Sequence, residues 1–342
     1  MKLTSPIKFF GFTALLALVC LVVNLSLGSV GIPFKDTFSI LFGGEIENSS
    51  WEYIIMNYRL PKALTAVMVG SGLAIAGLMM QTLFRNPLAG PFVLGISSGA
   101  SLGVALLVLG AGILGGSLAG FALKSWSIVI AASLGSFLVL LAVLAVTTRV
   151  KDTMAILIIG LMFGSLTSAV VAVLAYFSPS DDLQRYVFWS FGGLGGNSWG
   201  SIGILAACFI LGMLLSFRNI KSLNALLLGP DYAESIGVNR KRATLYIIFA
   251  TCILAGAITA FAGPIAFVGL AVPHLTRLFI NTSDHRILLP AVALVGAILM
   301  LLCDLIAQLP FSEFTLPINA ITSLLGAPVV IWLLVRKRKL LF

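Results

Sequence analysis

A serine-containing string and two histidines are the first residues of this sequence to suggest catalysis. The segment from Gly95 to Gly99 reads GISSG and matches G-x-S-x-G, the pattern that holds a nucleophilic serine where a strand turns into a helix. The surrounding residues lack such a strand, and His274 and His285, the only histidines, stand at the edges of distant apolar runs. A hydrolase or an intramembrane protease is therefore the least favoured interpretation.

Asp304 is the one acidic residue well inside a long apolar run. A carboxylate is costly to bury in a membrane, so such a residue is a candidate for binding or moving a proton or an ion. No second acid or base stands inside another run to complete a relay. The favoured interpretation is that Asp304 lies near the outer surface and hydrogen-bonds to a neighbouring helix. The alternative is an ion-coupled secondary transporter that uses Asp304.

Three other kinds of site have no matching pattern. The G-x-x-x-x-G-K-[ST] loop that holds nucleotide phosphates does not occur, so any ATP must be hydrolysed by a partner subunit. The four cysteines lie inside apolar runs without metal-ligand spacing, which indicates packing residues. Lys and Arg stand in short loops rather than in one patch that could bind nucleic acid. We expect no catalytic residue, metal or bound cofactor in this chain.

Long apolar runs carry these residues. Of 342 residues, 59% are apolar and 10% are charged, whereas an ordinary soluble domain has about one half and about one quarter. A helix needs about 20 apolar residues to cross a bilayer, where every backbone polar group must be paired internally. The sequence therefore predicts an all-α polytopic membrane protein, with residues 1–342 forming a single transmembrane domain.

Ten transmembrane helices are predicted. They cover 9–27, 63–84, 91–110, 125–148, 153–177, 198–217, 243–262, a short broken helix from Gly263 and Pro264 to 276 that Pro273 interrupts, 287–308 and 317–335. The short helix is required because both flanks of the run 243–276 are basic and must face the cytoplasm. Both termini then face the cytoplasm, and the only outward-facing basic residues are Lys35, Arg59, Lys62, Lys124 and Arg185.

The segment 218–242 is the longest polar stretch and must lie outside the hydrocarbon. It nevertheless contains Leu226, Leu227, Leu228, Ile236 and Val238. A loop that only meets solvent has no need of these side chains, whereas exposed apolar surface marks an interaction site. We therefore interpret 218–242 as a cytoplasmic segment that contacts another protein.

Several short motifs follow one another in a distinctive order along the chain. They are Arg59-Leu60-Pro61-Lys62; Gly70, Gly72, Gly77 and Gln81; Asn86-Pro87-Leu88-Ala89 and Pro91; Leu94 to Ala100; Trp189, Gly192 and Trp199; Leu228-Gly229, Ala233, Ile236 and Gly237; Gly263 to Leu270, Pro273-His274 and Arg277; Asp284-His285-Arg286 and Pro290; Asp304; Leu316-Pro317-Ile318; and Gly326-Ala327-Pro328. Over essentially the whole chain they resemble the iron-chelate and vitamin B12 permeases of ABC importers, the FecCD/BtuC type.

The resemblance implies the type II ABC importer permease architecture in the cytoplasmic (inner) membrane. It implies a homodimer of ten-helix subunits, two cytoplasmic ABC ATPase subunits and an extracytoplasmic substrate-binding protein. ATP would be used by the ATPase subunits, the substrate path would follow the dimer axis, and membrane lipid would surround the subunits. None of these partners follows from hydropathy alone.

The resemblance also assigns roles to residues. It implies ATPase coupling by Leu228, Gly229, Ala233, Ile236 and Gly237 within 218–242. Arg59 and Lys62 match positions that present cations to acidic residues of the binding protein, although they could equally anchor a helix at the headgroups. The remaining motif residues are expected to be structural, namely Gln81, Asn86, Pro87, Gly99, Gly263, Pro264, Pro273, His274, Asp304 and Pro328.

Three residues depart from the family pattern. Gln308 stands where relatives often carry an arginine, which removes one salt bridge expected in docking. Thr315 and Asn319 stand where Glu and Gly are common, so the entrance to the last helix is predicted to differ. The predicted substrate is an iron chelate of the siderophore type, with haem and cobalamin as alternatives, because all three groups of permeases share these motifs.

Overall fold

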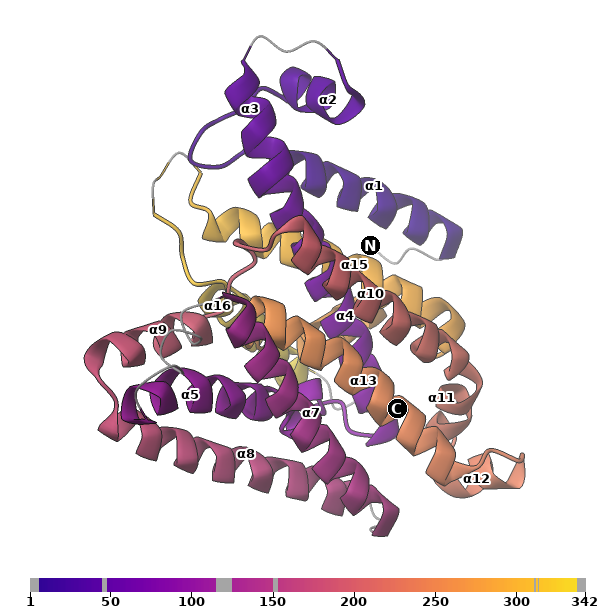
Figure 1. The fold of residues 1–342 in the computed structure, drawn as a ribbon. Coiled ribbons are helices and arrows are strands. Elements are labelled where there is room, and N and C mark those ends of the chain that lie inside the picture. The colour runs from indigo at the N-terminus through magenta and orange to yellow at the C-terminus, as the bar shows by residue number, and fades with distance from the viewer. Residues whose placement is uncertain are drawn as a thin grey trace.

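The computed structural model describes residues 6–44, 48–114, 125–149, 153–310, 312 and 314–336, and its regular elements there are all helices (Figure 1). The all-α class is confirmed. Each predicted span coincides with a helix of the described chain. These are α1 (Pro6–Ser26), α4 (Leu60–Leu83), α5 (Ile96–Leu114), α7 (Ser125–Arg149), α8 (Thr153–Phe177), α10 (Trp199–Arg218), α13 (Arg240–Ala262), α14 (Val268–Phe279), α15 (His285–Ala307) and α16 (Ile318–Arg336).

These helices differ in whether they are long enough to cross a bilayer. Within the described residues, seven helical stretches are long and apolar enough by length and composition, including Ser49–Leu83, which joins α4 to the turns before it. The apolar stretches of α5 and α16 are shorter. Helix α14 has 12 residues and so covers about 18 Å. The ten predicted spans therefore match in position, and α14, whose two ends both lie within the described residues, is too short for a full crossing.

Short helices that the hydropathy pattern did not reveal connect the long ones. They are α2 (Phe34–Phe42), α3 (Ser49–Ile54), a π-helical turn (Ile55–Arg59), a 3-10 turn (Pro91–Leu94) and α9 (Ser180–Ser190). Helices α2 and α9 mix polar and apolar residues, so no uniformly apolar run marks them. The polar segment 218–242 contains two further short helices, α11 (Ile220–Leu227) and α12 (Pro230–Ser235).

Helix α4 lies at the centre of the bundle, packed against α10, α13, α14 and α15. Its glycines make this possible. A Cβ atom on Gly70 would overlap the backbone of Gly296 in α15, and one on Gly77 would overlap the backbone of Gly269 in α14. Small residues let membrane helices approach this closely. In a second group, formed by α5, α7 and α8, Gly99 of α5 meets the backbone of Gly135 in α7 in the same way.

The helix is interrupted between α13 and α14 at Gly263 and Pro264, where these two residues predict an interruption. Gly263 has a φ of +72°, and a Cβ there would come within 2.8 Å of the Trp189 carbonyl oxygen. Phe267 also has a positive φ, at the residue before α14 begins. The Ala266 backbone N–H of this unwound segment donates to Asn319 Oδ1 at 3.0 Å. Asn319, one of the departures from the family pattern, thus joins the start of α16 to the break.

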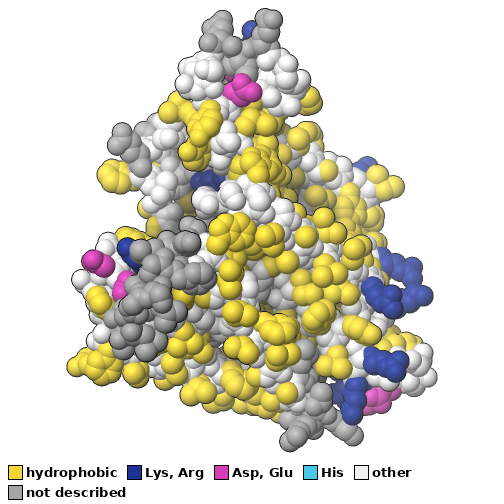
Figure 2. All heavy atoms as spheres, viewed as in Figure 1, with side chains coloured by type: hydrophobic (Ala, Val, Ile, Leu, Met, Phe, Trp, Pro, Cys, Tyr) yellow, Lys and Arg dark blue, Asp and Glu magenta, His cyan; other side chains and the backbone are white. Residues whose placement is uncertain are grey.

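Helices α4 and α15 run antiparallel and define two ends of the bundle. At the pocket end, α4 begins near the ends of α1 and α15. At the opposite end, called the coupling end after the role predicted for 218–242, α4 ends beside α11 and the start of α15. Lys and Arg side chains gather over the side of the molecule that carries α11 and α12 (Figure 2). Asn239 and Asp284 cap α13 and α15 with their side chains at this end.

Candidate functional site

A cavity of about 820 Å³ opens at the pocket end. Its wall combines aromatic rings, a glycine-rich loop and one pair of opposite charges. The principal lining residues are Tyr53, Tyr58, Phe188, Phe191 and Trp199, the loop 192–198, Lys62 and Asp304, and Thr315 to Ile318. Thr315, another departure from the family pattern, is therefore part of this wall.

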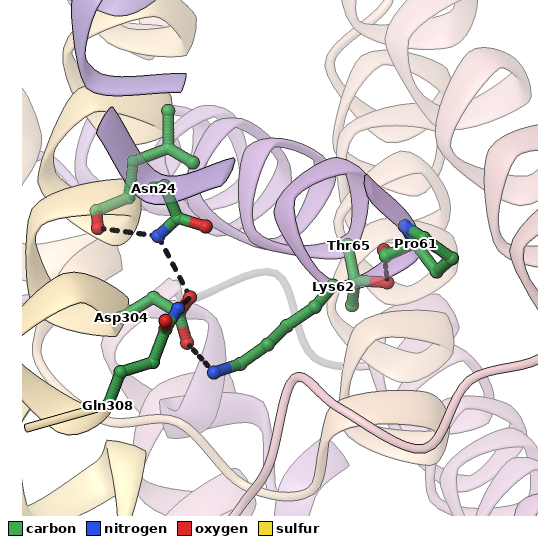
Figure 3. Close-up of polar contacts among 7 residues, drawn as sticks. Asn24, Pro61, Lys62, Thr65, Asp304 and Gln308 are labelled. Atoms are coloured by element: carbon green, nitrogen blue, oxygen red, sulfur yellow. Dashed lines mark hydrogen bonds and ion pairs between the residues drawn. The ribbon is translucent and has the colours of Figure 1, made fainter. Parts of the chain in front are cut away.

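Lys62 and Asp304 form an ion pair at the edge of this cavity (Figure 3). Lys62 Nζ lies 2.9 Å from Asp304 Oδ1, and the side chains are 23% and 2% exposed. Asn24 of α1 donates to Asp304 Oδ2 at 2.9 Å, and Gln308 donates to the same oxygen at 2.6 Å. Charged acceptors make such hydrogen bonds stronger than neutral ones. The carboxylate is thus held by α1 and α4 as well as by its own helix, as the favoured interpretation of Asp304 anticipated.

Two members of this network were not recognised as such in the sequence. Asn24 was overlooked, although an asparagine inside an apolar run is a recognisable signal for a hydrogen bond between membrane helices. Gln308 was expected only to remove a docking salt bridge. The structure shows that its amide donates to Asp304, so this residue takes part in orienting the carboxylate that pairs with Lys62.

Arg59 is 8% exposed and points into the protein rather than toward the cavity. Its guanidinium donates to the carbonyl oxygens of Leu25 and Ser26, each at 2.8 Å, and to that of Val30. These bonds hold the end of α1 and the segment after it against the π-helical turn that leads into α4. The geometry therefore supports a structural role for Arg59, and of the two predicted docking residues only Lys62 lines the cavity.

Ser97 lies in the first turn of α5 and is 9% exposed. Its hydroxyl is 3.4 Å from the Thr259 hydroxyl. The histidines have other partners, because His274 Nε2 lies 2.8 Å from the Pro87 carbonyl oxygen and His285 Nε2 lies 2.9 Å from the Thr82 hydroxyl. The GISSG string therefore packs a helix start against α13.

Replacing Ser97 by alanine should leave transport within about twofold of wild type. The substitution removes one hydrogen bond between neutral groups, which contributes about 1 kcal/mol to stability and nothing to a reaction. Uptake by membrane vesicles that contain the variant measures the effect. A loss of uptake in a correctly inserted variant would restore the nucleophile interpretation.

At the coupling end, α12 and the residues just outside it expose three large apolar side chains. Leu228, Tyr232 and Ile236, hereafter the apolar stripe, follow one another at a spacing of four residues and are 65%, 49% and 55% exposed. Tyr232 was not singled out in the sequence. A patch of this kind in a polar segment outside the hydrocarbon marks a protein interaction site.

The other predicted coupling residues determine the backbone conformation under and beside the apolar stripe. Ala233 is fully buried beneath it, and its N–H bonds to the Gly229 carbonyl oxygen at 3.0 Å. Gly229 and Gly237 have φ values of +113° and +88°, where any other residue is strained. A Cβ on Gly237 would have no heavy atom within 4 Å. Strain, not crowding, is therefore the cost of a larger residue at Gly237 in this chain.

The remaining motif residues join helices. Gln81 of α4 accepts from the Arg277 side chain at 3.0 Å and donates to the Leu270 carbonyl oxygen at 3.3 Å, so it attaches α14 to α4. Asn86 Oδ1 accepts from the Leu88 backbone N–H at 2.9 Å and shapes the turn after α4. Pro273 lies buried inside α14, and Pro328 lies exposed inside α16.

Comparison with known proteins agrees with this architecture. The model of the FecCD transport family matches residues 15–336. The hemin transport system permease HmuU of Yersinia pestis is 35% identical over 336 residues, which are 98% of this chain and 97% of the relative. The vitamin B12 import system permease BtuC of Klebsiella pneumoniae is 37% identical over 330 residues, 96% and 93% of the two chains.

A solved structure has the same fold. It is an inward-facing metal-chelate type ABC transporter, 30% identical, with a TM-score of 0.83 over 97% of this chain and 100% of that chain. Fold and relatives together define an ABC importer permease, a multi-pass membrane subunit of a class that implies separate ATPase and substrate-binding partners. The chain belongs to the FecCD transport family.

Proposed function

We propose that this chain is the permease subunit of an importer that moves an organic metal chelate across the cytoplasmic membrane, while a separate subunit hydrolyses ATP. The observation that carries the proposal is the full-length similarity to permeases for hemin and vitamin B12 and to a metal-chelate type transporter. A metal held by an organic ligand is common to these substrates. An iron–siderophore complex is our first candidate within this class, beside haem and cobalamin.

The charge distribution supports the orientation. Basic residues gather around α11 and α12, and by the positive-inside rule this end faces the cytoplasm. Helix α1 runs from that end toward the pocket end, which places its N-terminus inside and the cavity outside. Helix α8 exposes a row of apolar side chains, among them Ile158, Leu161 and Leu166. Such surfaces suit contact with lipid or with a second copy in a homodimer.

In this orientation, each end of the bundle faces one partner protein. The cavity, with Lys62 at its edge, faces the substrate-binding protein, whose acidic residues Lys62 would steer and orient. The apolar stripe fits a groove on the ATPase subunit. ATP binding would stabilise one arrangement of the helices over another, and the substrate path would open alternately to the two sides.

Uptake of three different chelates, each measured by itself, tests the proposed cargo class. The permease, its ATPase and its binding protein are reconstituted in liposomes, and ATP-driven uptake is measured separately for a ferric siderophore, haem and cobalamin. We expect saturable uptake of one of them and none of the same metal supplied without its organic ligand. Uptake of the free metal ion, or of no chelate at all, would contradict the proposal.

A further inference from the structure

A group of polar side chains at the coupling end joins three helices, with Thr82 and His285 buried and Asn224 and Asp284 half-buried. It consists of Thr82, Asn224, Asp284 and His285, hereafter the polar cluster. His285, the first residue of α15, is 0% exposed, and its Nδ1 lies 2.7 Å from Asn224 Oδ1 in α11. Its Nε2 lies 2.9 Å from the Thr82 hydroxyl in α4, and its backbone N–H donates to Asn224 Oδ1 at 2.9 Å. One amide oxygen of α11 therefore caps α15 and holds its first side chain.

The orientation of the Asn224 amide follows from its other contact. Asn224 Nδ2 lies 2.7 Å from Asp284 Oδ1, and a carboxylate can only accept, so the nitrogen must face Asp284. Asn224 Oδ1 then faces His285, whose Nδ1 must carry the proton that it donates. Hydrogen bonds from the Arg286 backbone and the Asn224 side chain lower the pKa of Asp284. Asp284 therefore remains an acceptor at neutral pH.

The polar cluster connects the apolar stripe to the cavity. Helix α11 leads directly into the stripe at Leu228. Helices α4 and α15 extend from the cluster to the pocket end, where they carry Lys62 and Asp304. They are packed backbone to backbone at Gly70 and Gly296, so they resist sliding over their length of about 35 Å.

Buried apolar side chains would attach α11 to the bundle even without the polar cluster. Leu223, Ala225 and Leu226 are all buried beside Asn224. Apolar contacts are not directional, so by themselves they would let α11 rotate or slide over α4 and α15 when a force acts on it. The hydrogen bonds of the polar cluster are directional. They fix the position of α11 relative to the first turn of α15 and the last turn of α4.

We infer that Asn224 and His285 are positioning residues that make α11, α15 and the end of α4 move as one unit, so that displacement of the apolar stripe reaches the cavity. The inference rests on the proposed function, because it needs an ATPase that displaces the stripe. Weakening the cluster should leave ATP hydrolysis in place and reduce the amount of substrate imported for each ATP hydrolysed.

Exchanging the side chains of Asn224 and Asp284 tests this inference. Asn224→Asp keeps the size of the side chain but sets two carboxylates against each other, and we expect imported substrate per ATP to fall about tenfold. Asn224→Asp with Asp284→Asn removes the repulsion and lets the new amide donate to the new carboxylate, but it loses the bond that Asp284 Oδ1 accepts from the Arg286 N–H, so it should recover part of the ratio. Asn239→Asp is the control, because this exposed residue at the same end keeps its capping oxygen.

The measurement uses the whole transporter, reconstituted with its ATPase and binding protein. Equal losses of import and hydrolysis, failure of the double variant to recover, or loss of the ATPase from the Asn224→Asp complex would overturn the inference. Absence of ATP-driven uptake in the wild-type transporter would instead overturn the proposed function before any variant is compared.

Discussion

Replacing Leu228 and Ile236 together by aspartate will abolish ATP-driven uptake without preventing insertion of the permease into the membrane. Both side chains are more than half exposed in the structure, so the substitutions leave no cavity in the fold. In the assembled transporter they would bury two carboxylates at an interface. Interface residues of this kind contribute roughly 2 kcal/mol each, so affinity for the ATPase should fall about a thousandfold.

Capture of the ATPase subunit by the purified, tagged permease measures this affinity. Leu183→Asp with Val187→Asp is the matched control, since it adds the same charges to exposed positions of α9 near the other end. The control should bind the ATPase like wild type. Undiminished capture by the Leu228 and Ile236 variant would place the ATPase contact elsewhere on the chain.

Lys62→Met will destabilise the folded permease, and adding Asp304→Asn will restore most of the loss. The single substitution leaves Asp304 as a charge that is 2% exposed and has lost its cation. Removing one partner of a buried ion pair costs about 3 kcal/mol or more, whereas removing both charges is often nearly neutral. In the double variant the amide oxygen at position 304 can still accept from Asn24 and Gln308.

Thermal unfolding of the three proteins in one detergent measures these changes. Lys35→Met is the control for loss of a lysine, because Lys35 lies exposed on α2. Similar unfolding temperatures for Lys62→Met and wild type would show that the pair contributes little. Strictly additive losses in the double variant would show that Lys62 and Asp304 act independently.

The sequence predicts most of the fold because a bilayer imposes a simple pattern. Long uncharged runs locate the long helices, and the basic residues on both flanks of 243–276 require the short α14. Helices α2 and α9 escape this reasoning, because they mix polar and apolar residues outside the long runs. Glycine spacing predicts close packing, but it does not reveal that Gly70 meets Gly296.

The sites are only partly predictable for a related reason. Of the apolar residues in 218–242, Leu228 and Ile236 are exposed, as expected for an interaction surface, whereas Leu226 is buried against the bundle, which the sequence pattern did not distinguish. Contacts between residues that are far apart in the sequence have no comparable local signal. Asn24 and Asp304 are 280 residues apart, and nothing local indicates that Arg59 points inward while Lys62 reaches the cavity. Asn224 stands between Leu223 and Ala225, close to the polar Lys221 and Ser222, so nothing local distinguishes it before its partner His285 is known.

The energy source of uptake tests the central claim most directly. Liposomes that contain the permease and its ATPase, with loaded binding protein outside, are compared with liposomes that contain the permease alone under a proton or sodium gradient. The account predicts chelate uptake only in the first set and only with ATP on the ATPase side. Uptake by the permease alone, driven by the gradient and lost in Asp304→Asn, would contradict it and favour an ion-coupled carrier.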